Sequence, residues 1–366
     1  MDASAKPALT DAERRLSLAA VIISSFGVGI SFGLGYPLTA IALEGKGEPS
    51  WIIGLAGAAP SIAILILLPL LPAAVSRVKP HITILAGCVL SGLGYLALYA
   101  IESTYAWIAI RFLMGAAVAM PWIVGETWIN YVSNDETRTR TIAIYATTFF
   151  AGFAIGPMLL DATGTAGSLP FLAGIVGTLV SAVPIYIARH LAPDLAHDPA
   201  TGLFGGVLMS PAAMAGAFLG GFLEMSHFSL LPNVAMAAGM DEGGALHLLT
   251  ALLIGGLATQ FILGWIGDKT SREKVLIGLG LCYIALVALL PDVLRSTSIA
   301  LITVFLLGAA VIGFYTIGLA ILGEAVPTQD LATANAAFIM MYTVGGIAGP
   351  AVSGGGGEGG NQKRGF

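Results

Sequence analysis

Residues 264–274 read GWIGDKTSREK, a short polar stretch between two long apolar runs. It holds five charged residues, although charged residues make up only 10% of the chain. Its glycines let two helices meet through a tight turn, and an acid followed by spaced bases can make and break ion pairs at neighbouring helix ends. We therefore expect a charged loop between two helices, built on Gly264, Gly267, Asp268, Lys269, Arg272 and Lys274.

The composition outside this loop indicates a membrane protein. Hydrophobic residues make up 57%, the mean hydropathy is +0.89, and 48 glycines are spread through apolar sequence. This combination excludes a soluble globular domain. A membrane-spanning helix needs roughly 20 apolar residues, and eleven segments qualify, centred near Ile30, Ala63, Ser91, Ala117, Ala151, Gly177, Leu223, Ala258, Leu281, Ala310 and Met341.

Basic residues are distributed unevenly between the two sets of loops. Eleven lie on the side of the N-terminus, and two, Lys46 and Arg295, lie on the other. The positive-inside rule therefore predicts a cytoplasmic N-terminus in a bacterial inner membrane, and we expect the first span to be retained. The net charge of -5 comes without a basic patch, so no nucleic-acid partner is expected. Cys88 and Cys282 lie within apolar spans and are interpreted as inert packing.

Three patterns recur in the same order when the chain is shifted by about 195 residues. They are Arg77-x-Lys79 with Arg272-x-Lys274, Gly125-Glu126 with Gly323-Glu324, and Gly152-x-x-x-Gly156-Pro157 with Gly345-x-x-x-Gly349-Pro350. Such a repeat is typical of two parallel helical halves related by an axis along the membrane normal. Close helix packing explains the paired glycine patterns.

The stretch at 264–274 resembles the cytoplasmic loop signature of the major facilitator superfamily, Gly-x-x-x-Asp-Arg-x-x-Arg-Arg/Lys. Lys269 replaces the first arginine, which keeps the charge and loses the bidentate geometry. Residues 126–130, Glu-Thr-Trp-Ile-Asn, are similar to the end of helix 4 in a small bacterial branch of that family. The resemblance covers residues 14–352 and implies an all-α fold of two six-helix halves.

The expected organisation has five parts. A cytoplasmic tail occupies 1–16, the N-terminal half 17–189, a connector 190–210, the C-terminal half 211–352 and a flexible glycine-rich tail 353–366. Residues 353–361 are nearly all small, and glycine-rich sequence favours a flexible chain over a spanning helix. We therefore expect the C-terminal half to contain five helices, with helix 12 missing.

Charged residues near the predicted cytoplasmic helix ends are interpreted as a conformational latch that holds the outward-open state. Contacts present in one state only would bias the equilibrium between states. Direct proton carriage by Glu126 is the alternative. The latch residues are Arg77, Glu126, Gly264, Gly267, Asp268, Lys269, Arg272, Lys274 and Glu324.

Ionisable residues inside the spans are candidates for substrate binding or proton coupling. Arg111-x-x-x-Gly115 resembles the helix 4 motif of the superfamily, which implies a cavity-facing arginine; a structural hydrogen-bond hub is the alternative. Glu224 and His227 lie three residues apart, hence on one helix face, and could load and unload a proton. An interhelical hydrogen bond between satisfied polar groups would explain the pair equally. Trp122 and Gln260 are further substrate candidates, with packing as the alternative.

No phosphate-binding loop and no hydrolytic constellation occurs in the sequence, so we expect no enzyme activity, cofactor or metal. The best interpretation is a secondary transporter, monomeric in the lipid bilayer, that moves a small solute by alternating access and couples to protons or another ion. A non-transporting sensor or scaffold and a channel are the alternative classes. Substrate, transport direction and coupling ion cannot be read from the sequence.

Overall fold

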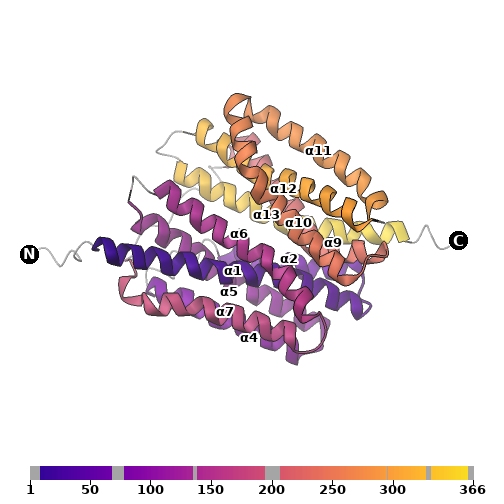
Figure 1. Ribbon diagram of the computed structural model, residues 1–366, viewed down its shortest axis with the longest axis horizontal. Coiled ribbons are helices and arrows are strands. Elements are labelled where there is room, and N and C mark those ends of the chain that lie inside the picture. The colour runs from indigo at the N-terminus through magenta and orange to yellow at the C-terminus, as the bar shows by residue number, and fades with distance from the viewer. Residues whose placement is uncertain are drawn as a thin grey trace, which may run out of the picture.

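The computed structural model describes residues 9–67, 78–134, 138–193, 207–294, 296–326 and 331–361. These residues form eleven α-helices and one 3-10 turn, η1 (Arg189–Leu191), and they contain no strand (Figure 1). The helices are α1 (Asp11–Gly45), α2 (Ser50–Leu67), α4 (Pro80–Ala100), α5 (Thr104–Val132), α6 (Arg138–Thr163), α7 (Leu169–Ile187), α9 (Pro211–Ala237), α10 (Glu242–Lys269), α11 (Arg272–Val293), α12 (Thr297–Ala325) and α13 (Leu331–Asn361). The predicted all-α fold is confirmed.

Each of the eleven predicted spans corresponds to one long helix. Among the described residues, ten helices are long and apolar enough to cross a membrane. The exception is α9, which has 27 residues but includes Glu224, His227 and Asn233. Polar residues lower the hydropathy of a helix, and in a membrane they mark positions that face a protein interior or a cavity.

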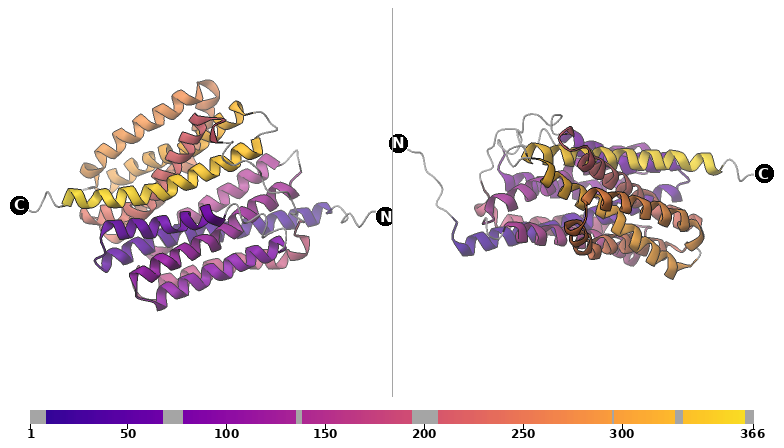
Figure 2. Two further views of the ribbon diagram at one scale, coloured as in Figure 1. Left: turned by 180° about the vertical axis from the view of Figure 1, so that it is seen from behind. Right: turned by 90° about the horizontal axis from the view of Figure 1, so that it is seen from above.

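The helices form two groups that lie side by side (Figures 1 and 2). In the N-terminal half, α1 packs on α6 and α7, and α4 packs on α5 and α7. In the C-terminal half, α9 packs on α12 and α13, and α12 packs on α10 and α11. The two halves meet mainly where α2 contacts α13 and α6 contacts α10.

The repeat between the halves is more regular in the structure than in the sequence patterns. Both ends of α12 lie 193 residues after the corresponding ends of α5, and α13 begins 193 residues after α6. This offset makes Leu319 the equivalent of Glu126. The predicted match of Glu126 with Glu324 is therefore wrong, because it rested on one short Gly-Glu pair instead of the whole helix.

Paired glycines bring equivalent helices into close contact, as predicted. A Cβ atom at Gly152 of α6 would overlap the carbonyl oxygen of Phe26 in α1. Likewise, a Cβ atom at Gly345 of α13 would overlap the carbonyl oxygen of Phe218 in α9. Small residues at these positions allow backbones to approach closely, which is how helices associate within a membrane.

The polar contacts described between the halves lie at one end of the bundle. We call the end where α1 begins proximal and the end where α1 finishes distal. At the distal end, Asp161 Oδ2 lies 3.2 Å from His247 Nε2, and Asn233 Nδ2 donates to the carbonyl oxygen of Ala40 at 3.3 Å. Somewhat deeper in the bundle, Thr250 Oγ1 donates to the Ala154 carbonyl oxygen at 3.2 Å. These contacts join the halves on the distal side.

Both ends of the chain are more helical than expected. The predicted N-terminal tail, 1–16, is helical from Asp11, where Thr10 and Glu13 form a capping box that satisfies free amides. The predicted tail 353–366 is wrong in its start, because α13 continues to Asn361. Glycine disfavours a helix by roughly 1 kcal/mol relative to alanine, but Gly354 packs directly against the Ser50 carbonyl of α2. A residue with a side chain would not fit at this position without a shift of the backbone.

Candidate substrate pocket

A cavity of about 260 Å³ lies between the two halves. Six helices supply most of its wall: α1, α5 and α6 from the N-terminal half, and α9, α12 and α13 from the C-terminal half. Glu126, Tyr145 and Leu319 line it and lie in the proximal parts of their helices. The cavity therefore extends from the middle of the bundle towards the proximal end, away from the distal contacts.

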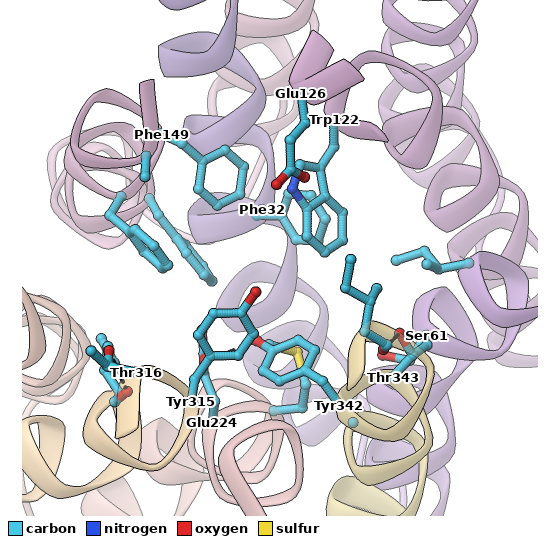
Figure 3. Close-up of a pocket in the computed structure, with 18 of the residues that line it drawn as sticks. Phe32, Ser61, Trp122, Glu126, Phe149, Glu224, Tyr315, Thr316, Tyr342 and Thr343 are labelled. Carbon is cyan, nitrogen blue, oxygen red and sulfur yellow. Dashed lines mark hydrogen bonds between the residues drawn. The ribbon is translucent and has the colours of Figure 1, made fainter. Parts of the chain in front are cut away.

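Glu224 is the acidic group that the C-terminal half places at the cavity. Its side chain is only 3% exposed, and its Oε2 accepts a hydrogen bond of 2.8 Å from the Tyr342 hydroxyl. Tyr315 stacks edge-to-face on Tyr342, with ring centroids 5.3 Å apart. The three residues come from α9, α13 and α12, and Figure 3 shows them on one side of the pocket. They form a cluster in which Glu224 is buried and the two tyrosines are half-buried.

His227 lies on the same helix as Glu224 but has different neighbours. Its Nδ1 lies 2.6 Å from the carbonyl oxygen of Leu223, and its ring packs edge-to-face on Tyr283 of α11 at 5.8 Å. His227 is not among the residues that line the cavity. The structure thus brings Glu224 together with Tyr342, while His227 faces another helix.

The N-terminal half places a second acid at the cavity, Glu126 of α5. Figure 3 shows it with Trp122, Phe32 and Phe149 on the side facing Glu224. Trp122 stacks on Phe149 with centroids 6.2 Å apart, and Phe32 meets both rings edge-on. Glu126 was assigned to the latch by sequence, but in the structure it belongs to the pocket wall.

Gln260 also lines the cavity, as the sequence suggested for a substrate contact. On the distal side, Phe153 of α6 stacks on Phe228 of α9 with centroids 4.4 Å apart. Because these helices belong to different halves, this stack bridges the interface next to the pocket, and Phe153 itself lines the cavity. Phe228 is fully buried there.

Arg111 is buried next to the pocket but does not line it. It is 4% exposed, and its guanidinium lies 4.6 Å from the centre of the Tyr36 ring. Its Nε and Nη2 have no hydrogen-bond partner among the described residues, and it borders a separate cavity of about 20 Å³. Tyr36 touches both cavities, so Arg111 contributes a positive charge from behind this ring.

The residues of the charged loop lie at the proximal ends of α10, α11 and α12. Arg272 Nη1 forms an ion pair with Glu324 Oε1 at 2.9 Å and donates to the Ala320 carbonyl oxygen at 2.8 Å. Lys269 lies over the Trp265 ring, Lys274 is exposed, and Gly267 is buried. Arg77 and the side-chain environments of Gly264 and Asp268 lie outside the described part of the structure. Arg272 and Glu324 both belong to the C-terminal half.

Several pocket residues were missed by sequence reasoning, chiefly Tyr342, Tyr315, Phe149 and Ser61. The internal repeat of the sequence could have indicated two of these residues, Phe149 and Tyr342. Phe149 and Tyr342 each precede the paired glycine motif of their half by three residues and are 193 apart. Each therefore shares a helix face with a glycine that contacts the neighbouring helix.

The fold and the pocket define a multi-pass membrane protein with two helical halves around a central cavity. The sequence profile of the Major Facilitator Superfamily matches residues 17–350, and the chain belongs to this family of transporters. Over 340 residues it is 27% identical to "Uncharacterized MFS-type transporter YfkF" of Bacillus subtilis (strain 168), covering 89% of this chain and 85% of that protein. It is 26% identical over 270 residues to "Uncharacterized MFS-type transporter YcaD" of Escherichia coli O7:K1, covering 72% and 67%.

Solved structures share the fold. A bacterial homologue of the human lysosomal transporter Spinster, in an inward-facing and unoccupied conformation, matches with a TM-score of 0.79 at 14% identity, covering 97% of this chain and 86% of that one. The nucleoside transporter NupG matches with a TM-score of 0.76 at 14% identity, covering 93% and 91%. These similarities confirm the predicted architecture.

Proposed function

We propose that this protein is a secondary transporter that carries a small solute across a bacterial inner membrane by alternating access. The observation that carries the proposal is the central cavity, whose walls come from both halves, combined with inter-half polar contacts at the distal end. Rocking the halves would break the distal contacts and close the proximal side. The cavity would then face the other compartment.

The orientation proposed from the basic residues makes the proximal side cytoplasmic. The conformation would then be inward-facing, like that of the Spinster homologue. In this proposal the latch of Asp268, Arg272 and Glu324 stabilises the opposite, outward-facing state. The ion pair between Arg272 and Glu324 exists within one half, so the latch would act through additional contacts formed when the halves rock.

Proton coupling is assigned in this proposal to Glu224. A buried carboxyl at a cavity between two halves can exchange its proton with either side as the cavity changes its exposure. Tyr342 donates a hydrogen bond that favours the carboxylate, so it is the nearest partner for this exchange. His227 would act only indirectly, through the packing of α9 against Tyr283.

Labelling of a cysteine in the pocket tests alternating access without knowledge of the substrate. Thr316 lines the cavity, so Thr316→Cys is introduced in a Cys282→Ser background, since Cys282 is exposed and Cys88 is buried. An impermeant maleimide should label residue 316 from both sides of the membrane in oriented vesicles. Labelling from one side only would contradict a transporter and favour a sensor or scaffold. An ion current that does not saturate with ion concentration would favour a channel.

A further inference from the structure

We propose that the central pocket binds a small lipophilic organic cation, a monovalent ammonium carried on an aromatic or aliphatic body. This inference names a substrate class for the transporter proposed above, and it rests on that function. It is drawn from the charge, the shape and the aromatic content of the pocket.

The pocket wall contains two acidic side chains. Glu126 and Glu224 line the cavity, and the described lining residues include no lysine, arginine or histidine. The two acids come from opposite halves and lie on opposite sides of the pocket, with Tyr315 in front of Glu224 in the view of Figure 3. An ionised carboxylate in a low-dielectric site is stabilised by a positive charge close to it. A cation placed between the acids would be attracted to both, whereas an anion would be repelled by both.

Aromatic rings make up much of the remaining wall. They are Phe32, Tyr36, Trp122, Tyr145, Phe149, Phe150, Phe153, Tyr315 and Tyr342. The face of an aromatic ring attracts a cation within about 6 Å, most strongly for tryptophan, and proteins recognise quaternary ammonium groups with such cages. The same rings bury apolar groups well. Aromatic walls with carboxylates therefore suit a cation whose charge sits on a hydrophobic body.

Arg111 is a positive charge next to this pocket, and its position limits its effect. It lies behind Tyr36 and lines the separate small cavity, with its guanidinium held over the tyrosine ring. Among the residues whose side chains the structure describes, two acids therefore line the wall, while Arg111 stays behind it. Residues with neutral polar groups, such as Gln260, Thr316 and Thr343, complete the lining without adding charge.

The volume sets the size of the solute. A cavity of about 260 Å³ exceeds the roughly 150 Å³ apolar cavity that accepts benzene in another protein. One ring with a small substituted ammonium therefore fits this space. Benzyltrimethylammonium is a suitable probe because it combines a phenyl ring with a permanent charge.

Calorimetric titration of the purified full-length chain tests the proposal with three probes that share the phenyl ring. Benzyltrimethylammonium is positive, benzyl alcohol is neutral and phenylacetate is negative. We expect the cation to bind at least about tenfold more tightly than either other probe, which corresponds to roughly 1.4 kcal/mol from ring and carboxylate contacts. Equal affinity for the three, preference for phenylacetate or no binding of the cation would overturn the proposal.

Variants of the wall locate the binding. Glu126→Gln and Glu224→Gln should each weaken cation binding by about tenfold while benzyl alcohol binding stays unchanged, because only the charge is removed. Trp122→Ala should weaken it more than Trp122→Phe, which keeps a ring face. Glu102→Gln is the matched control, since this exposed carboxyl lies in the loop before α5. Unchanged cation affinity in both wall-acid variants would refute the site.

The outcome is separable from that of the proposed function. Each variant is first checked for a monodisperse elution profile, and Glu126→Gln carries the test if Glu224→Gln does not fold. Cation binding without two-sided labelling of residue 316 would support the binding site and contradict the proposed transport function. Two-sided labelling without cation binding would support the proposed transport function and contradict the proposed substrate class.

Discussion

The two halves place different chemistry at equivalent positions of the same helical frame. Trp122 and Tyr315 are equivalent aromatic residues of α5 and α12, and Phe149 and Tyr342 are equivalent residues of α6 and α13. The acids break this equivalence. Glu126 corresponds to Leu319, and Glu224 corresponds by the packing of Gly29 and Gly221 to Phe32.

This difference shows how a repeated fold acquires a directional site. The glycine contacts and helix lengths are shared, since both halves need the same close packing. The pocket side chains have diverged, so each half contributes one carboxylate from a different level of the wall. The predictions below test which features are shared and which belong to one half.

The largest expected effect comes from joining the halves at the distal end. Asp161→Cys with His247→Cys, bridged by a short reducible bifunctional thiol reagent, should hold the distal contacts closed. Thr316→Cys should then react with an impermeant maleimide from the proximal side alone, and reduction should restore labelling from both sides. The control bridges Glu48→Cys and Thr104→Cys, whose wild-type side chains are hydrogen-bonded at the distal end within the N-terminal half. A loss of labelling in that control as well would contradict the rocking of two halves.

The two acids should differ in function. In Glu224→Gln, uptake of benzyltrimethylammonium driven by a pH gradient across proteoliposomes should fall by at least about tenfold, while exchange at saturating probe persists. Coupling requires the group that binds and releases the proton, whereas exchange requires only binding and movement. Glu126→Gln should raise the KM for the probe and keep the gradient-driven accumulation. Accumulation at the wild-type level in Glu224→Gln would show that Glu224 is not the proton-coupling residue.

The shared packing should make the halves respond alike to added volume. Gly152→Ala and Gly345→Ala each insert a Cβ atom against a backbone carbonyl, and we expect each to lower the free energy of unfolding by about 1–3 kcal/mol. Gly278→Ala is the control, because nothing lies within 4 Å of its Cβ position and it should be neutral or stabilising. Thermal unfolding in detergent measures all three. A destabilisation of one half only would show that the packing is not equivalent.

The smallest effect is expected at the proximal ion pair. Glu324 is 63% exposed, so its contact with Arg272 is screened by water, and Glu324→Gln should change the free energy of unfolding by less than about 1 kcal/mol. Its influence on the two conformations can still be measured. If the latch proposal holds, the variant should increase labelling of Thr316→Cys from the proximal side. Unchanged labelling rates would remove Glu324 from the latch.

Local sequence patterns predicted the helices and their close glycine contacts. Which side chains meet in the pocket could be seen only in the whole fold. The Gly152 and Gly345 motifs predicted helix packing correctly, because two helix backbones can approach this closely only where the side chain is absent or very small. The spacing of Glu224 and His227 placed both on one helix face, yet Tyr342 and Tyr283 come from helices distant in sequence. No local pattern specifies these neighbours.

In the C-terminal segment, a local pattern led to a wrong prediction. Its glycines predict a flexible chain by propensity alone, but α13 continues through them to Asn361, and Gly354 packs on α2. Similarly, Gly125-Glu126 matched Gly323-Glu324 over two residues, whereas the full helices align Glu126 with Leu319. Both errors arise where a short segment is judged without the rest of its helix and the helices around it.

The contact between α2 and α13 also has a consequence for biosynthesis. Gly54 in α2 packs against the backbone of Pro350 in α13, so an early helix has a late partner. A ribosome adding roughly 5–20 residues per second makes the intervening ~300 residues in about 15–60 s. During that time the glycine face of α2 borders lipid or the insertion machinery. Assembly of the two halves is therefore completed only after the last described helix has entered the membrane.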